Sequence, residues 1–366
     1  MNSLDRQWEE VRNDVIDAVD EIGRSGWFVL GKQVMSFEKE ICSLFGKSRA
    51  VGVASGLDAI EIGLRALGCT FGSKVLTTPL SAFATTLAIL KVGAIPIFVD
   101  VDPLGLIDLD AAERLLAKDT SIKFVVPVHL YGFPLDLERI SSWRTKFGVS
   151  IIEDCAQAIN AAYKGIQCGA VGQIAATSFY PTKNLGAMGD AGALMTNDET
   201  LAKRSEVLRD YGQSAKYFHS EVGLNSRLDE LHAAILNKLI SKLPKWTERR
   251  KQIAARYLDE IENPMITTLR PSEPMDPVWH LFPVLVDADR RNSFRAHMIS
   301  QNIETGVHYP SIIPKQAALK ALEFHIHGSL AGAEAFAASQ ISLPINPYLT
   351  EEEITFVISA CNRWRL

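Results

Sequence analysis

Two apolar runs of the sequence end next to side chains that can do chemistry. The first run, Val149–Asp154, ends in the carboxylates Glu153 and Asp154. The second, Ala176–Tyr180, is followed shortly by Lys183. Both runs read as short buried strands, and ligands of open α/β sheets usually bind at the carboxyl ends of strands. Asp154 and Lys183 are therefore candidates for a ligand site at the edge of a sheet.

The two side chains suit one kind of cofactor chemistry. Lysine forms an imine with an aldehyde cofactor, and a lowered pKa makes its amine available. An aspartate can hold a ring nitrogen protonated, which pyridoxal phosphate needs in order to act as an electron sink. Each residue also has an ordinary interpretation. A loop lysine such as Lys183 is usually solvated, and Asp154 can cap the turn that follows its strand.

A third fragment suits a phosphate. Small residues at Ser55 and Gly56 precede a helical pattern, and the free N–H groups at a helix start bind anions. The fragment is neither a GxGxxG fingerprint nor a Walker loop, because no Gly-Lys-Ser/Thr follows. An ordinary capped helix is the alternative interpretation.

Apolar runs alternate with helical patterns over the first two thirds of the chain. The helical pattern Asp58–Leu67, for example, places Ile60, Leu64 and Leu67 on one face. This alternation predicts an α/β fold with a parallel or mixed sheet between helices. The predicted strands are Lys74–Thr78, Pro96–Val101, Lys123–Val128, Val149–Asp154, Ala176–Tyr180 and Gly192–Thr196.

The pattern changes near Ser226. One long helix or two are predicted over Leu228–Arg256, with a kink or break at Pro244. A strand, a helix and a closing helix are then predicted at Trp279–Val286, at Asn292–Gln301 and from Thr350. We therefore expect a large domain over residues 1–245, including an N-terminal segment, and a smaller α+β domain over residues 246–366.

Composition restricts the class of partner. The chain has 366 residues, 47% hydrophobic and 22% charged, with a net charge of −5. This balance gives no reason to expect nucleic acid or an anionic membrane as a partner. The N-terminus lacks a signal-peptide pattern, and the five cysteines form no CxxC pair, so we expect a reducing cytoplasm. His325 and His327 have no evident third ligand, so no metal site is predicted.

Taken together, the motifs resemble those of the DegT-type sugar-nucleotide aminotransferases, which are fold-type I enzymes that use pyridoxal phosphate. The resemblance spans nearly the whole chain, and it rests on the order and spacing of the motifs. They are Gly26–Trp27 to Gly31, SGLDAI at 55–60, PIFVDVD at 96–102, HLYG at 129–132, EDCAQA at 153–158, SFYPTKNLGAMGDAGA at 178–193, GLNSRLDELHAAIL at 223–236 and HYP at 308–310.

The resemblance implies a role for each matching residue. Lys183 forms the Schiff base and then moves a proton between substrate carbon and cofactor. Asp154 pairs with the pyridinium nitrogen, and Gln157 reaches the ring hydroxyl. The phosphate is held by Ser178 and by the segment Ser55, Gly56 and Leu57. Asn225 contacts the cofactor phosphate of the neighbouring subunit, which implies a homodimer with shared active sites.

Three positions depart from the family pattern. The aromatic residue that stacks on the cofactor ring is Phe83 when counted from Pro79, but position 82, an alanine, when counted back from the following helix; we assign Phe83. The histidine that usually follows HYP is missing from residues 311–314, which read Ser-Ile-Ile-Pro. The usual glutamine of the GxNxR helix is His232 here, interpreted as a structural change.

The resemblance also implies the reaction. Glutamate is the expected amino donor, and the acceptor is a keto-sugar attached to a nucleoside diphosphate. SGLDAI and the run at 209–217 look more like the enzymes that aminate C-3 than those that aminate C-4. Lys216, Tyr217, His308 and Tyr309 are candidates for contacting sugar or diphosphate, with packing at a domain or dimer boundary as the equal alternative.

Three other functions compete. A non-catalytic regulator or binding protein with the same fold is disfavoured by the intact set of Asp154, Gln157, Ser178 and Lys183. A sugar dehydratase of the same family has histidine in place of the lysine, so Lys183 favours transamination. A nicotinamide-dependent dehydrogenase lacks its glycine fingerprint here and leaves Lys183 unexplained.

Overall fold

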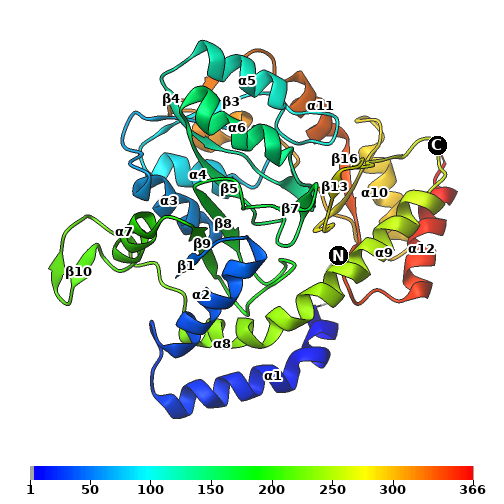
Figure 1. Cartoon of the computed structure of the whole chain (residues 1–366). Coiled ribbons are helices and arrows are strands. Elements are labelled where there is room, and N and C mark those ends of the chain that lie inside the picture. Colours follow the sequence, from blue (N-terminus) through cyan, green and yellow to red (C-terminus); the bar gives the residue numbers. More distant parts are fainter. Residues whose placement is uncertain (1–3, 366) are drawn as a thin grey trace.

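An eight-stranded sheet forms the centre of the molecule in a computed structural model that describes residues 4–365 (Figure 1). The strand order is β1-β9-β8-β5-β4-β2-β3-β15. Every neighbouring pair is parallel except those of β9, which runs antiparallel to both β1 and β8. The bounds are β1 Arg49–Val53, β2 Lys74–Thr77, β3 Ile95–Phe98, β4 Ile122–Val126, β5 Ser150–Asp154, β8 Ile174–Ser178, β9 Gly192–Thr196 and β15 His325–Ile326.

Helices cover both faces of this sheet, which is why its strands are apolar without alternation. The strands β5, β8 and β9 are buried along almost their whole length. One apolar cluster joins the sheet to α3, α4 and α7, and another joins it to α5 and α6. The protein therefore has the predicted α/β fold. These helices are α3 Gly56–Ala66, α4 Phe83–Lys91, α5 Leu109–Lys118, α6 Leu137–Phe147 and α7 Glu199–Arg209.

Three helices pack together beside the first strand: α1 Leu4–Ser25, α2 Lys32–Leu44 and α8 Glu230–Leu239. The Glu230 carboxylate accepts hydrogen bonds from the backbone N–H groups of Gly31, Gln33 and Val34 at 2.8–3.0 Å. These are N–H groups at the start of α2, where a helix has no acceptors of its own and favours a negative charge. Glu230 thus fixes α2 to α8.

The C-terminal part begins with the predicted pair of helices. Helix α8 ends at Leu239, a 3₁₀ turn covers Ile240–Lys242, and α9 runs over Leu243–Glu260, so Pro244 lies in the first turn of a new helix. The sheet that follows has the order β12-β14-β16, with strands Thr267–Thr268, Phe282–Leu285 and Gln340–Leu343. Its helices are α10 Arg291–Ser300, α11 Ala331–Ser339 and α12 Glu351–Arg363.

The predicted strand boundaries are right at β9 and within one to three residues elsewhere, but the predicted strand Trp279–Val286 is too long. Trp279 has a φ of +50°, outside the strand conformation, and the strand β14 starts at Phe282. The predicted closing helix is confirmed. The Thr350 hydroxyl accepts from the N–H of Glu353, and the Glu353 carboxylate accepts from the N–H of Thr350.

The two parts of the chain share the large sheet. The strand β15, from the C-terminal part, pairs in parallel with β3 at the sheet edge, with His325 opposite Ile97. The domain division near residue 245 falls in the first turn of α9 and stays a prediction. No helix among residues 4–365 combines the length and the apolar character needed to cross a membrane. Two smaller sheets complete the fold: β6 Ala162–Tyr163, β7 Ile166–Gln167 and β13 Met275–Asp276 form one, and β10 Gln213–Ala215 and β11 Phe218–His219 form the other.

Candidate active site

The carboxyl ends of two neighbouring strands bring the predicted chemistry together. Asp154 is the last residue of β5 and lies opposite Ala176 of the parallel strand β8. Ser178 is the last residue of β8, and the turn that follows carries Lys183, whose N–H donates to Tyr180 O at 2.8 Å. This is the edge of an open α/β sheet where a ligand is expected.

Asp154 is buried and its two carboxylate oxygens are oriented by different donors. It is 4% exposed. The hydroxyl of Thr85 donates to Oδ2 at 2.7 Å, and the N–H of Ala156 donates to Oδ1 at 3.1 Å. Thr85, on α4, is a site residue that the sequence reasoning missed, since a threonine in an apolar helix carries no pattern of its own.

Lys183 has an amine that is easier to deprotonate than an ordinary lysine. Burial lowers its pKa to about 8, while the negative charge of Asp154 opposes this shift. Because the pKa lies near physiological pH, a substantial fraction of the side chain is the neutral amine. That form is the nucleophile that an aldehyde cofactor requires.

A tight cradle of small residues lies beside Ser178. The Ser55 hydroxyl accepts from the N–H of Asp58 at 3.1 Å and caps α3. A Cβ on Gly56 would come within 2.6 Å of the Ser178 Cβ, and one on Gly192 would come within 2.3 Å of the Ser55 carbonyl carbon. Only glycine fits at both positions. The first-turn N–H groups of α3, including that of Leu57, have no acceptor within the helix and can bind an anion.

Gln157 connects this edge of the sheet to the HYP motif. Its Oε1 accepts from the N–H of Tyr131 at 2.6 Å, and its Nε2 donates to the hydroxyl of Tyr309 at 3.2 Å. The Tyr131 hydroxyl in turn donates to His308 O at 2.5 Å. Residues far apart in the sequence thus meet around Gln157, and one amide hydrogen of Gln157 remains for a ligand.

The two side chains of the HYP motif are uncharged. Burial raises the pKa of Tyr309 to about 12, with a contribution from the negative charge of Asp154, so its phenol stays protonated. Burial lowers the pKa of His308, and the positive charge of Lys183 lowers it further. His308 is held by its Nδ1, which lies 3.0 Å from Ser342 Oγ.

A second missed residue is His280, a buried histidine from the C-terminal part. Its Nδ1 lies 3.1 Å from the Oδ1 of Asn184, the residue after Lys183. Burial lowers the pKa of His280 well below its ordinary value, and the charges of Lys183, Arg250 and His308 add to this effect. A lone histidine gives no signal in the sequence that it approaches a lysine almost one hundred positions earlier.

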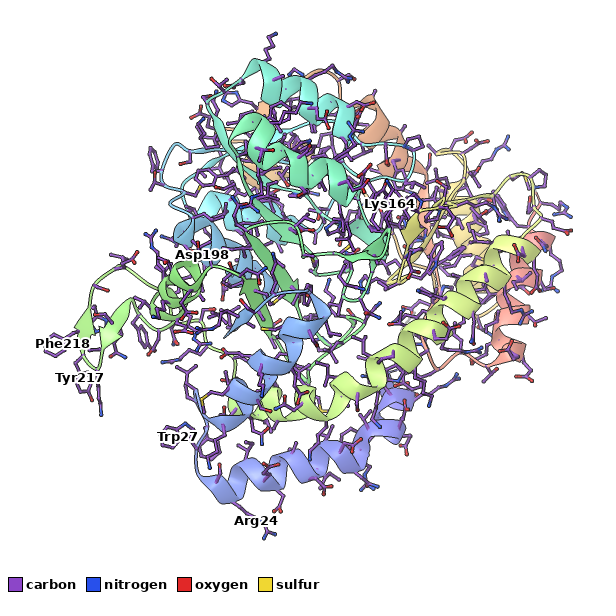
Figure 2. All side chains as sticks on the ribbon, viewed as in Figure 1. Arg24, Trp27, Lys164, Asp198, Tyr217 and Phe218 are labelled. Carbon is purple, nitrogen blue, oxygen red and sulfur yellow. The ribbon has the colours of Figure 1, made fainter. Side chains whose placement is uncertain are left out.

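Two predicted residues lie on a hairpin away from this cluster, and a third lies on the surface next to the start of α3. Lys216 and Tyr217 occupy the turn of the β10–β11 hairpin, which projects from the body of the molecule, with Tyr217 and Phe218 at its tip (Figure 2). Tyr217 is 79% exposed, and Asn225, beyond the hairpin, is exposed too. Asn225 directly precedes Ser226, whose hydroxyl accepts from the N–H of Ala54 at 3.1 Å and donates to Asp58 at 2.8 Å, beside the start of α3.

The position of Phe83 bears on its predicted stacking role. Phe83 begins α4 and packs against the largest apolar cluster. Thr85 points toward Asp154, and successive residues of an α-helix are rotated by about 100°. Phe83, two positions before Thr85 on this helix, is therefore turned to a different side of it than Thr85. The stacking role of Phe83 stays a prediction.

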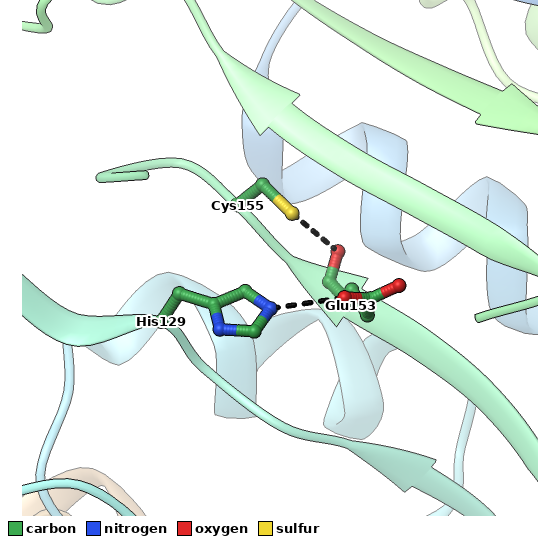
Figure 3. Close-up of side chains that lie close together, drawn as sticks. All are labelled: His129, Glu153 and Cys155. Carbon is green, nitrogen blue, oxygen red and sulfur yellow. Dashed lines mark hydrogen bonds and ion pairs between the residues drawn. The ribbon is translucent and has the colours of Figure 1, made fainter. Parts of the chain in front are cut away.

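His129, Glu153 and Cys155 lie close enough to suggest a metal site (Figure 3). Glu153, however, lies 3.1 Å from His129 Nε2 and accepts from the N–H groups of Gly169, Val171 and Gly172. The other nitrogen, His129 Nδ1, accepts from the N–H of Leu135. Burial raises the pKa of Cys155 and keeps it a thiol. The polar atoms are already used to fasten β5 to the loop at 169–172.

Comparison with known proteins identifies the scaffold. The model of the DegT/DnrJ/EryC1/StrS aminotransferase family matches residues 9–362. The chain belongs to this family. A DegT/DnrJ/EryC1/StrS relative from Geobacillus stearothermophilus, named "Pleiotropic regulatory protein", is 39% identical over 98% of this chain and 96% of that protein. A dTDP-3-amino-3,4,6-trideoxy-alpha-D-glucose transaminase of Streptomyces venezuelae is 38% identical over 99% of this chain and 94% of that protein.

The fold agrees with that of a solved member of the family. The crystal structure of S. venezuelae DesV in complex with a ketimine intermediate matches with a TM-score of 0.94 and 38% identity, covering 99% of this chain and 97% of that chain. The protein is accordingly a pyridoxal-phosphate-dependent aminotransferase. The residues present fit this cofactor, since a buried carboxylate, a lysine with a lowered pKa and a cradle that admits only glycine share one edge of the sheet.

Proposed function

We propose that the protein transfers an amino group from glutamate to C-3 of a keto-sugar carried by a nucleoside diphosphate. The observation that carries the transamination is Lys183, whose pKa is lowered to about 8, beside the buried carboxylate Asp154. The sugar class is supported by the name of the S. venezuelae relative, which makes a 3-amino sugar. The same lysine disfavours the dehydratase alternative.

Bound pyridoxal phosphate supplies an electron sink for the charge that develops at the substrate carbon. Lys183 Nζ, as the neutral amine, is placed to carry a proton to and from that carbon. Asp154 is the carboxylate that would hold the proton on the ring nitrogen of the bound cofactor. The donors Thr85 and Ala156 keep its two oxygens in place, so it needs no reorganisation during the reaction.

The same edge of the sheet would hold the remaining parts of the cofactor. Ser178 Oγ accepts from the N–H of Tyr180 at 3.2 Å, which leaves its own hydrogen free to donate to the phosphate. The N–H groups of Gly56 and Leu57, at the start of α3, complete this anion site. Gln157 has one amide hydrogen left, which would donate to the ring hydroxyl.

His308 and Tyr309 provide a neutral wall for the sugar. A protonated phenol and an uncharged imidazole can exchange hydrogen bonds with hydroxyl groups without placing a further charge beside Lys183. The segment after HYP lacks the usual histidine, and Ile313 N–H is bound instead to Pro79 O at 2.8 Å. This backbone hydrogen bond attaches the segment to the loop before α4.

The active sites are proposed to be shared within a homodimer. Several large apolar side chains that a monomer would leave in water lie on the side of the molecule that carries the projecting hairpin (Figure 2). Trp27 is 62% exposed and Phe218 is 72% exposed. Exposed apolar groups of this size mark interaction surfaces. On this proposal Asn225, Lys216 and Tyr217 reach the cofactor and substrate of the partner subunit. The cytoplasmic location stays a prediction.

The test is an absorbance spectrum of the protein with pyridoxal phosphate, recorded before and after adding glutamate. The wild type should show a near-visible band that glutamate bleaches, and the Lys183→Ala variant should lack the band of lysine-bound cofactor. Keto-sugars of the two types, 3-keto and 4-keto, are then compared as agents that restore the band. Absence of the band refutes the enzyme, and restoration by the 4-keto sugar alone refutes the C-3 assignment.

A further inference from the structure

We propose that His280 and Asn184 form a positioning pair that sets the orientation of Lys183 from the C-terminal part of the chain. This inference rests on the proposed function, in which Lys183 is the reacting amine, and adds residues that act on it. His280 is not assigned contact with the reacting atoms. It acts through Asn184, which directly follows Lys183 in the chain.

The hydrogen bonds of Asn184 fix which way its amide points. Its Nδ2 donates to Val278 O at 3.3 Å, so its Oδ1 faces the Nδ1 of His280 at 3.1 Å. An amide oxygen only accepts, so the His280 Nδ1 must carry the hydrogen. The Asn184 side chain, next to Lys183, is thus hydrogen-bonded both to the carbonyl of Val278 and to the ring of His280.

The segment 278–281 is also hydrogen-bonded to Tyr131 and Gly132, and the N–H of Tyr131 donates to Gln157. The N–H of Val278 donates to Gly132 O at 3.0 Å, and the N–H of Leu281 donates to Tyr131 O at 3.4 Å. Gly132 has a φ of +87°, and a Cβ there would lie 2.9 Å from the His280 nitrogen and 3.0 Å from Gln157 O. Only glycine allows this close approach. His280 therefore lies between the Gly132 backbone, which contacts Gln157, and Asn184, which follows Lys183.

Burial lowers the pKa of His280, and neighbouring positive charges lower it further, so the ring is neutral and Nδ1 carries the hydrogen that Asn184 accepts. The groups that face it are Lys183, Arg250 and His308, and the positive charges of Lys183 and Arg250 oppose a positive charge on its ring. Arg250 is buried and donates to the carbonyls of Trp279, His280 and Ile345 at 2.9–3.4 Å. Arg250 therefore fixes the backbone of His280, and the His280 ring is free to donate to Asn184.

The arrangement links the position of the C-terminal part to that of the reacting amine. A small displacement of Lys183 is costly, because misplacing a reacting group by about 1 Å can lower a rate on the order of a hundredfold. Only the His280 nitrogen that bonds Asn184 should matter for this role. The two amide replacements of histidine separate the nitrogens, since asparagine places an amide near Nδ1 and glutamine places one near Nε2.

The experiment compares the His280→Asn and His280→Gln variants in the cofactor-loaded protein. We expect His280→Asn to retain most of the wild-type kcat and the pH midpoint of the near-visible band. His280→Gln should lower kcat on the order of tenfold or more and shift that midpoint, with the KM for glutamate little changed. The matched control is His297→Gln. His297 lies on α10, and its Nε2 is 2.9 Å from Ala360 O of α12, so this variant should resemble the wild type.

Equal impairment of the two amide variants, or a wild-type midpoint and kcat in His280→Gln, overturns the proposal. A double-mutant cycle covers poor folding: Asn184→Ala and His280→Ala should be non-additive in the rate at which pyridoxal phosphate binds to Lys183. Additive effects in this cycle also overturn it. A wild-type protein without any near-visible band refutes the proposed function itself, whereas a normal wild type with a normal His280→Gln variant refutes only this inference.

Discussion

At the scale of single residues, the reacting amine is controlled by two opposing effects. Burial lowers the pKa of Lys183 to about 8, and Asp154 acts in the opposite direction by stabilising the ammonium form. Removing the carboxylate should therefore lower the pKa of Lys183 further, so that the amine appears at a lower pH. The sign follows from charge alone and does not depend on the identity of the sugar.

We predict that Asp154→Asn shifts the reactivity of Lys183 toward lower pH in the cofactor-free protein. The measurement is the pH profile of labelling by an amine-specific reagent, followed by mass spectrometry of the peptide that contains Lys183. Asp289→Asn, an exposed aspartate in the C-terminal part, serves as the control and should leave the midpoint near 8. A shift of the Asp154→Asn midpoint toward higher pH would contradict the assigned electrostatics.

Two adjacent threonines of α4 provide a second prediction. Thr85 donates to Asp154, whereas the Oγ1 of Thr86, also buried, has no hydrogen-bond partner among the described residues. Thr85→Val should cost about 1.5–3 kcal/mol of unfolding free energy, the usual value of a hydrogen bond to a charged group. It should also weaken cofactor binding, because Asp154 loses a donor that orients it.

Thr86→Val is the matched control, since the same change at the next position loses no hydrogen bond. Its stability should be equal to that of the wild type or higher, because the buried hydroxyl it removes has no partner. Urea unfolding of both variants, with and without pyridoxal phosphate, makes the comparison. Equal losses in the two variants would show that helix packing, rather than the bond to Asp154, determines the effect.

At the scale of elements, the phosphate cradle depends on the contact between β9 and the start of α3. A Cβ at Gly192 would lie 2.3 Å from the carbonyl carbon of Ser55 and 2.6 Å from the nitrogen of Gly56. Gly192→Ala should therefore push the strand and the helix start apart. We expect a loss of stability of about 1–3 kcal/mol, the usual cost of overpacking, and weaker cofactor binding.

Gly23→Ala is the opposite case and controls for the glycine-to-alanine change itself. Gly23 lies in α1 with nothing within 4 Å of the added Cβ, and it lacks a positive φ. Alanine should stabilise this helix by about 0.5–1 kcal/mol. Thermal unfolding and cofactor titration of the two variants decide the matter, and cofactor affinity in Gly192→Ala equal to that of the wild type would speak against the cradle.

The central elements could be predicted from the sequence because their signals are local. An apolar run that ends in Glu153 and Asp154, or one that precedes Lys183, shows both the strand and its chemical end. The strand β15 and the hydrogen bond from His280 to Asn184 could not be predicted, because both are contacts between segments that are distant in the sequence. The predicted start of β14 at Trp279 is too early, because Trp279 has a positive φ and an apolar pattern does not reveal backbone angles.

At the scale of the whole molecule, part of the predicted site lies on the surface. Lys183, Asp154 and Gln157 gather at one sheet edge, while Asn225 is exposed and the hairpin before it projects into solvent. A second copy of the chain accounts for both facts when the two subunits exchange these segments across a two-fold axis. In the proposed homodimer, each active site would need residues from both chains.

This arrangement predicts that two inactive variants restore activity to each other. Lys183→Ala removes the amine, and Asn225→Ala removes the proposed contact to the partner's cofactor. A mixed dimer of the two has one site that carries both changes and one site that is wild type. If subunits mix at random, about a quarter of all sites become intact. The measurement is the transamination rate after the two proteins are unfolded together, refolded and loaded with pyridoxal phosphate.

Lys183→Ala mixed with Asp154→Asn is the control and should stay inactive, because both changes affect the same chain's contribution and each mixed site keeps one of them. Failure of the Lys183→Ala and Asn225→Ala mixture to exceed this control, in samples shown to contain mixed dimers, would place Asn225 outside the partner's site.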